Sequence, residues 1–391
     1  MNPKATLRFR RATAGLAVFW ALLGLCVGLE LRLRSGAGPQ LPFFFETVVG
    51  ISLIITGVPP EAELAGVAVG DRLLEIDGRD ADDWLVGGGP PLREGVANRY
   101  LFGRGAGHFE AELAPLAPRG RALNTTDLLA LVIPLLVGAI YFGIGVTVWL
   151  LRPASAEAWA FLLFCSCLSS ELFLSGPQSR VTWHLNWVNA PLLGATAFHL
   201  FTTYPLEPDW IVRRHRLRLL PYLGALALVG FSVVSPHLGV SPSWVGGAML
   251  VFTIGLFAIS LGSLGLARLR MHSTERSGLA DVVLLGAAVS FIPVLSMILA
   301  QMFLGRALPW FLFLGFLLLF PVAVAYGIVR RQLFEIRLVR SSSVAYAAVS
   351  VAITGLFALL ITTADVLVGE FNVNARSPWF SVTFLFVAIL A

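Results

Sequence analysis

The sequence has little charge for its length. Charged residues make up 13% of the 391 residues, whereas 57% are hydrophobic and the mean hydropathy is +0.80. Soluble domains carry about 25% charged residues, so most of this surface is not suited to water. Many apolar runs approach the ~20 residues that cross a bilayer core. The composition therefore predicts a mostly α-helical polytopic membrane protein.

Catalytic and metal-binding motifs are also missing. Lys4 is the only lysine, which excludes a Ser/Lys protease dyad deeper in the chain. None of the six histidines has the His-Glu-x-x-His spacing of a zinc protease. The three cysteines, Cys26, Cys165 and Cys167, lie in apolar runs, so no disulfide framework or zinc knuckle is expected in the polar part. We expect no catalytic residue, metal or cofactor within these residues.

The chain divides into an anchor (1–34), a polar region (35–126) and a series of apolar runs (127–391). The first apolar run exceeds a signal-peptide core and lacks a small-residue cleavage site after it, which predicts an uncleaved anchor. The last run, from 379, has no charge and is too short to cross a ~30 Å core, so we expect the natural polypeptide to continue past Ala391. With the anchor, about ten helices are predicted, the others at residues 127–151, 158–175, 188–206, 217–235, 246–267, 279–303, 308–329 and 344–368.

Basic residues lie unevenly in the short segments between these runs. Alternate segments, beginning with the N-terminal tail, hold 16 basic residues, whereas the opposite short loops hold only Arg180, Arg306 and Arg376. Cytoplasmic loops are enriched in Lys and Arg, so the N-terminus is expected inside and the polar region outside. Because the arginines are spread over several loops rather than gathered in one patch, no nucleic-acid partner is expected.

The polar region carries a recognisable series of short elements. Residues 50–58 read as a buried strand, 59–66 as a short helix that begins with two prolines, and 72–78 as a strand closed by an Asp-Gly turn. Residues 109–116 read as the last strand. These elements resemble a PDZ domain of the bacterial type. The resemblance assigns structural roles to the turn residues Gly66, Gly70, Asp71, Asp77 and Gly78.

PDZ domains bind a peptide C-terminus or an extended segment by strand addition. The resemblance places such a ligand along Val48, Val49, Gly50, Ile51 and Leu53. The second helix of the family has a poor counterpart here, since residues 87–91 read Gly-Gly-Gly-Pro-Pro and only 92–100 could form a short helix. Two interpretations therefore stay open: a ligand-binding domain, or a domain with a structural role only.

Three ionisable residues fall within predicted spans: Glu171, His199 and Asp365. Such residues are costly in a bilayer and suggest a function. The plainer interpretation is that Glu171 and Asp365 reach the interface and that His199 satisfies a polar group of a neighbouring helix. A proton or ion relay would need a chain of such residues across the bilayer, which the sequence does not show.

Two stretches of the membrane region carry a second resemblance. His-Leu-Phe-Thr-Thr-Tyr-Pro at 199–205 and the segment 321–342 resemble the multi-span sensor region of bacterial membrane histidine kinases, including quorum sensors of the competence type. Glu335 stands where that family usually has Asp. The segment 330–340 can lie on the cytoplasmic surface with its arginines at anionic headgroups. It serves either as an anchor at the membrane surface or as a coupling segment that moves with the adjoining spans. The residues assigned to it are Arg330, Arg331, Phe334, Arg337 and Arg340.

The resemblance implies the sensory region of a two-component signal-transduction protein in the bacterial inner membrane. Its kinase part would lie beyond residue 391. A scaffold that binds periplasmic peptides through the PDZ-like domain is the alternative, and a transporter is a third. The expected partners are the lipid bilayer, a peptide or protein C-terminus at the PDZ-like domain, and a second copy in a homodimer.

Overall fold

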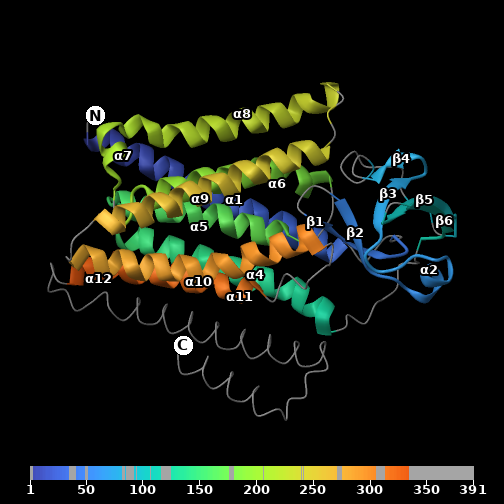
Figure 1. Ribbon diagram of the computed structural model, residues 1–391. Coiled ribbons are helices and arrows are strands. Elements are labelled where there is room, and N and C mark those ends of the chain that lie inside the picture. Colours follow the sequence, from blue (N-terminus) through green and yellow to red (C-terminus); the bar gives the residue numbers. More distant parts are fainter. Residues whose placement is uncertain are drawn as a thin grey trace, which may run out of the picture.

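The protein consists of a helical bundle with a small sheet at one end (Figure 1). A computed structural model describes residues 3–34, 41–48, 52–81, 84, 92–93, 95–105, 107–115, 125–175, 180–205, 207–238, 240, 242–270, 275–304 and 313–333. The longer helices run side by side, and the N-terminus lies at the end opposite the sheet. They are α1 (Pro3–Arg34), α4 (Thr125–Leu151), α5 (Ala156–Leu174), α6 (Arg180–Phe201), α8 (Leu220–Val234), α9 (Pro242–Arg270), α10 (Glu275–Leu304) and α12 (Leu319–Leu333).

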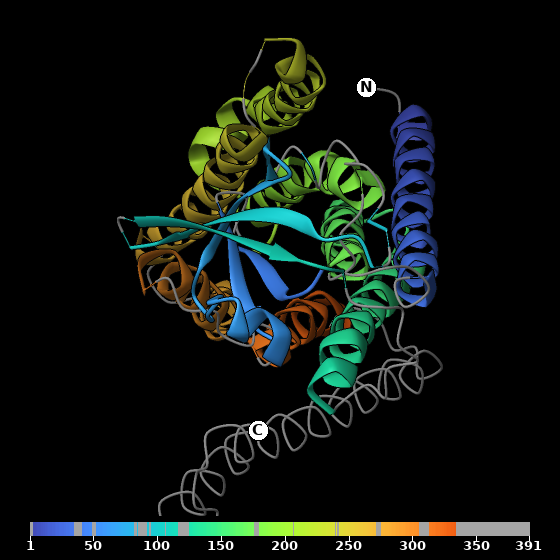
Figure 2. The same ribbon diagram turned by 90° about the vertical axis from the view of Figure 1, so that its right-hand side faces the viewer.

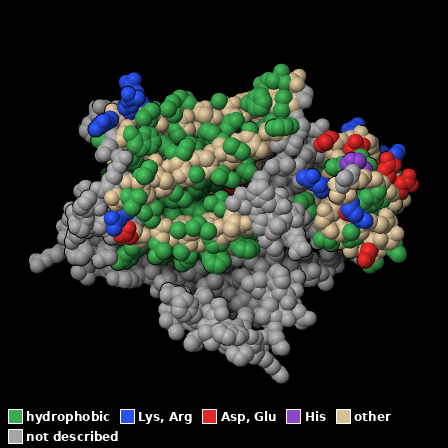
Figure 3. All heavy atoms as spheres, in the orientation of Figure 1, with side chains coloured by type: hydrophobic (Ala, Val, Ile, Leu, Met, Phe, Trp, Pro, Cys, Tyr) green, Lys and Arg blue, Asp and Glu red, His purple; other side chains and the backbone are tan. Residues whose placement is uncertain are grey.

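Within the described residues, five helices are long and apolar enough to cross a membrane. They cover Leu7–Arg32, Leu129–Leu151, Ala156–Leu174, Arg216–Val234 and Trp244–Leu266. Apolar side chains cover the visible face of the bundle (Figure 3), as expected where lipid replaces water. The total of ten spans remains a prediction. The proposed spans at 188–206, 279–303 and 308–329 fall largely on α6, α10 and α12, which are not among these five, and those at 344–368 and from 379 lie outside the described residues.

Short elements connect the long helices at both ends of the bundle. All four have at most five residues and are too short to cross a bilayer. Arginines gather at the end opposite the sheet, where α7 and the 3-10 helix η1 lie (Figure 3). The short elements are α7 (Asp209–Arg213), η1 (His215–Leu219), η2 (Ser235–Leu238) and α11 (Leu314–Leu317).

The polar region forms an antiparallel sheet with strand order β1-β2-β3-β5-β6, with β4 paired to β3. Seen from the sheet's side, the strands lie over the ends of the helices and α1 stands at one edge of the bundle (Figure 2). The elements are β1 (Phe44–Val48), β2 (Ser52–Gly57), α2 (Pro60–Leu64), β3 (Arg72–Ile76), β4 (Arg79–Asp80), β5 (Asn98–Arg104) and β6 (Gly107–Leu113).

Aromatic and aliphatic side chains make the core of this sheet domain. Phe43, Tyr100 and Phe102 are at most 3% exposed, and their rings pack edge to face or tilted with centroids 5.2–6.2 Å apart. Such offset aromatic contacts are the favoured ones. The sequence allowed a short helix over 92–100, but residues 98–100 instead begin β5. Tyr100 and Phe102 both point into the core there, as alternate residues of a strand do.

Candidate functional site

Helix α5 lies at the centre of the bundle. In the apolar stretch of α5 78% of the residues are buried, against 17% in the corresponding stretches of α8 and α9. Helix α5 packs mainly on α4, α1 and α6 and also contacts α12. The chain enters the sheet domain from α1 and leaves it into α4, so both connections of that domain run along α5. This makes the α5 contacts the first candidate for a functional site.

Glycines let α1 approach the backbone of α5. A Cβ on Gly24 would lie 2.6 Å from Ser170 Oγ, and one on Gly28 would overlap the carbonyl oxygen of Phe173. The two glycines have the G-x-x-x-G spacing that brings membrane helices into close contact. Helix α4 meets α5 in the same way, because a Cβ on Gly145 would lie 2.6 Å from Cβ of Cys165. We call these contacts the glycine clamp on α5.

Polar contacts hold α1 to α5 at both ends. At the sheet end, the guanidinium of Arg32 donates to the carbonyl oxygens of Phe173 and Ser175. At the opposite end, Arg10 donates to the carbonyl oxygen of Ala154 over 2.8 Å, just before α5 begins. There Trp159 Nε1 also donates to Thr13 Oγ1 over 2.9 Å. Helix α1 is therefore fixed to α5 along its length.

A third polar contact, between these two ends, joins α1, α5 and α6 through Asn189. Asn189 is fully buried; its Nδ2 donates to Glu171 Oε2 over 2.7 Å and to the Cys167 carbonyl over 3.0 Å. Its Oδ1 accepts from Trp20 Nε1 over 2.8 Å. We call Trp20, Glu171 and Asn189 the α1–α5–α6 polar cluster. It shows that Glu171 has a partner on another helix, which the sequence alone did not reveal.

His199 lies near the arginine-rich end of α6. It is 9% exposed, and the ring of Trp159 meets it edge-on at a centroid distance of 5.0 Å. Its Nδ1 lies 3.4 Å from the hydroxyl of Tyr222 on α8. The hydroxyl of Tyr222 is thus the polar group of a neighbouring helix that lies beside His199. The third intramembrane residue, Asp365, lies outside the described residues.

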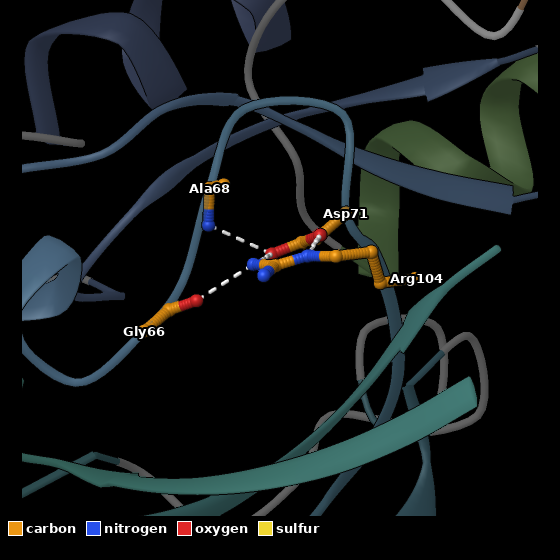
Figure 4. Close-up of polar contacts among 4 residues, drawn as sticks. All are labelled: Gly66, Ala68, Asp71 and Arg104. Carbon is orange, nitrogen blue, oxygen red and sulfur yellow. Dashed lines mark hydrogen bonds and ion pairs between the residues drawn. The ribbon is translucent and has the colours of Figure 1, made fainter.

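Asp71 organises the loops of the sheet domain (Figure 4). Its carboxylate is 3% exposed and accepts the backbone N–H of Ala68 over 2.7 Å. Arg104 donates to both carboxylate oxygens over 2.7 Å and also to the carbonyl of Gly66 over 2.6 Å. Burial alone would raise the pKa of Asp71, but the hydrogen bonds from Arg104 and Ala68 and the Arg104 charge outweigh it and lower the pKa. The preceding residue, Gly70, has φ +96°, a conformation that favours glycine.

The Asp-Gly turn after β3 is a second fixed point of the domain. Asp77 and Gly78 both have positive φ, +51° and +74°. The Asp77 N–H donates to the carbonyl of Arg99 over 2.7 Å, and its Oδ1 accepts the N–H of Arg99 over 2.8 Å. The turn is thereby tied to β5. Gly66 has φ +89° at the end of α2, so all five predicted turn residues lie in the loops of this domain.

Of the residues predicted to line a peptide groove, only Val48 and Leu53 lie in the described strands, and these two strands pair with each other. Leu53 is 1% exposed and belongs to the core, and Val48 ends β1. Residues 49–51 lie outside the described part of the chain. Strand β2 pairs with β1 on one side and β3 on the other, so strand addition along 52–57 does not fit this pairing. The outermost strands of the sheet are β1 and β6.

The predicted coupling segment is described only at its start. Arg330 and Arg331 lie in the last turns of α12, and residues from 334 onward, including Phe334, Arg337 and Arg340, lie outside the described residues. In the described ranges no three His, Cys, Asp or Glu side chains gather as metal ligands. The described geometry is thus one of helix contacts and buried hydrogen bonds.

No protein-family model matches the sequence, and neither any curated protein nor any solved structure does.

Replacing Trp20 by Phe is expected to lower the free energy of unfolding by about 0.5–1.5 kcal/mol, the range of single hydrogen bonds between membrane helices. The change keeps an aromatic ring but removes the Nε1 donor to Asn189. Thermal unfolding of the purified protein in one detergent would measure it. Trp244→Phe is the control, since Trp244 is 78% exposed. Equal stability of the two variants would show that the polar cluster does not hold α1.

Proposed function

We propose that this chain is the membrane-embedded input region of a bacterial signal-transduction protein whose output is a histidine kinase. One observation carries the proposal: the sheet domain is inserted between two helices, α1 and α4, that both pack on α5 through glycines. A force on the sheet domain therefore acts directly on the most buried helix. The resemblance of residues 199–205 and 321–342 to kinase sensor regions supports the identity of the output.

The contacts of α1 give this input a route to the far end of the bundle. Arg32 ties α1 to α5 beside the sheet, while Arg10 and Thr13 tie it to α5 at the opposite end. Trp159, which donates its indole N–H to Thr13 of α1, also packs on His199 of α6. A shift of α1 along α5 would thus reach α6 and the arginine-rich loops. Shifts of packed helices by 1–2 Å are a common form of signalling.

In this proposal the sheet domain is extracytoplasmic and the arginine-rich end faces the cytoplasm of a bacterial inner membrane. The described arginines of α7 and η1 lie at the end opposite the sheet, together with the start of α1. This arrangement is what the enrichment of basic residues in cytoplasmic loops favours. About ten spans, including those outside the described residues, complete the proposed topology.

The sheet domain is proposed to be PDZ-like and to take its ligand at β1. Six antiparallel strands, a short helix after β2 and the Gly70-Asp71 turn support this likeness. Because β2 is paired on both sides, an extended peptide would add to the outer edge of β1 instead. The same edge supports the second candidate function, a scaffold that recruits periplasmic peptides without a kinase output.

Phosphorylation of the natural polypeptide that contains these residues separates the two functions. Inverted membrane vesicles incubated with radiolabelled ATP are expected to yield an acid-labile phosphohistidine on this protein. The labelling rate should change in Gly28→Ala, which disturbs the glycine clamp, and not in Gly15→Ala, where a Cβ meets nothing within 4 Å. Absence of labelling in the wild-type protein would overturn the kinase proposal and favour the scaffold.

A further inference from the structure

The carboxyl group of Glu171 has an unusual set of partners for a membrane helix. Its one described hydrogen bond comes from Asn189 Nδ2, over 2.7 Å. A carboxylate held in a bilayer with a single neutral donor is costly, and such groups are normally paired with a cation or carry a proton. Whether a cation or a proton neutralises Glu171 therefore bears on the function of this site.

The orientation of the Asn189 amide follows from its neighbours. The indole N–H of Trp20 can only donate, so the Asn189 atom 2.8 Å away must be its oxygen. The NH2 group then faces two acceptors, Glu171 Oε2 and the carbonyl oxygen of Cys167. This NH2 group occupies the position between the two oxygens that a metal cation would need. A proton on Glu171 itself requires no such space.

No basic side chain neutralises Glu171 among the described residues. The nearest basic group along α1, Arg32, donates to the carbonyl oxygens of Phe173 and Ser175. The helices around Glu171 carry these further titratable or charged residues: Glu157, Cys165 and Cys167 on α5; Lys4, Arg8, Arg10, Arg11, Cys26, Glu30 and Arg34 on α1; Asp127 and Tyr141 on α4; Arg180, His184 and His199 on α6; and Tyr326, Arg330 and Arg331 on α12. No described hydrogen bond or ion pair joins any of these side chains to the carboxyl group.

Glu171 lies close to the sheet end of the bundle. It precedes the C-cap Ser175 by four residues, a rise of about 6 Å along the helix, and it is partly exposed. This end of α5 is the nearer one, so we assign the entry of protons to the compartment that holds the sheet domain. Its partner Asn189 lies on α6, and Asn189 in turn accepts from Trp20 of α1.

We propose that Glu171 is a proton-binding site through which the pH of the sheet-side compartment controls the contact between α1 and α6. In the ionised state the Asn189 N–H bonds a carboxylate, and such charge-assisted bonds are about twice as strong as neutral ones. Binding of one proton converts this bond to a neutral one and loosens the hold on Asn189. Trp20 of α1 donates to Oδ1 of the same Asn189 side chain, so a looser hold on Asn189 also affects α1. This site acts whatever output the chain serves.

Infrared difference spectra of the full chain in lipid nanodiscs, taken between neutral and acidic pH, test the site. The wild-type protein should show the carbonyl stretch of a protonated carboxylic acid, and Glu171→Gln should lose it. Asn189→Leu should keep the band at a higher frequency, because the carbonyl loses its donor. Glu157→Gln, at the other end of α5, is the matched control and should retain it. A carbonyl band that survives Glu171→Gln would overturn the proposal. A band that changes when choline replaces sodium in the buffer would overturn it as well.

The distance between α1 and α6 tests the consequence. Nitroxide labels placed at Phe19 and Val181, both more than half exposed, in a Cys26→Ser background report this distance by pulsed electron resonance. The distance distribution should change between neutral and acidic pH in the wild-type background and stay fixed with Glu171→Gln. An identical pH response in both backgrounds would show that another group moves α1.

Discussion

Replacement of Gly28 by alanine is expected to lower the free energy of unfolding by about 3 kcal/mol, the upper part of the range for overpacking a close contact. The added Cβ would overlap the carbonyl oxygen of Phe173, which is backbone and cannot turn away. It would also meet the Arg32 guanidinium at 2.9 Å, which disturbs the bonds of Arg32 to α5. The thermal unfolding temperature in a fixed detergent, or steric trapping in bicelles, would measure the loss.

Gly15→Ala on the same helix is the control for this change. No atom lies within 4 Å of a Cβ at Gly15, so alanine there should be neutral or stabilise the helix by up to about 1 kcal/mol. The contrast between the two variants isolates the clamp from helix propensity. Equal stability of Gly28→Ala and Gly15→Ala would mean that α1 does not pack on α5 as described.

Asp71→Ala is expected to destabilise the sheet domain by about 1.5–3 kcal/mol, because it removes a buried, charge-assisted acceptor. The change leaves the Ala68 N–H without its acceptor and releases Arg104 from its bidentate contact. Hydrogen exchange of the β3 amides in the full chain would report the loss. Glu63→Ala, an exposed change on α2, should leave these amides unaffected. Unchanged β3 exchange in Asp71→Ala would contradict the assigned role.

The stabilisation by Asp71 should also depend on pH. Its pKa in the folded domain is lowered, since the contacts with Arg104 and Ala68 outweigh the opposing effect of burial. In the unfolded chain an aspartate titrates near pH 3.9. The contribution is therefore complete above about pH 4 and is lost as the pH falls through the lower folded value. Asp71→Asn should remove this acid dependence while keeping part of the Ala68 hydrogen bond. Hydrogen exchange of the β3 amides, corrected for the intrinsic exchange rate at each pH, would measure this.

Local signals in the sequence predicted the parts of the fold that depend on neighbours along the chain. The apolar run 158–175 corresponds to α5, which Ser155 caps by accepting the Ala158 N–H. The Asp77-Gly78 turn was likewise predictable, because positive φ is mainly a property of these residue types. Both depend on contacts within a few residues.

Contacts between distant segments were not predictable in the same way. Strand β1 was missed, and with it the fact that β2 is paired on both sides. Trp20 and Asn189 are 169 positions apart and meet only because α1 and α6 turn these faces toward each other. No local signal in the sequence marks Arg104 as the partner of Asp71. The G-x-x-x-G spacing of Gly24 and Gly28 was a readable signal for the α1 contact.

The account depends most on the sheet domain and the arginine-rich end lying on opposite sides of one membrane. A reporter enzyme that is active only outside the cytoplasm, inserted separately at Gly88 in the polar region and at His272 between α9 and α10, tests this directly. We predict activity for the insertion at Gly88 and none at His272, with equal amounts of both fusion proteins in the membrane. Activity at His272 and none at Gly88 would contradict the orientation, and with it an input region that faces the outside.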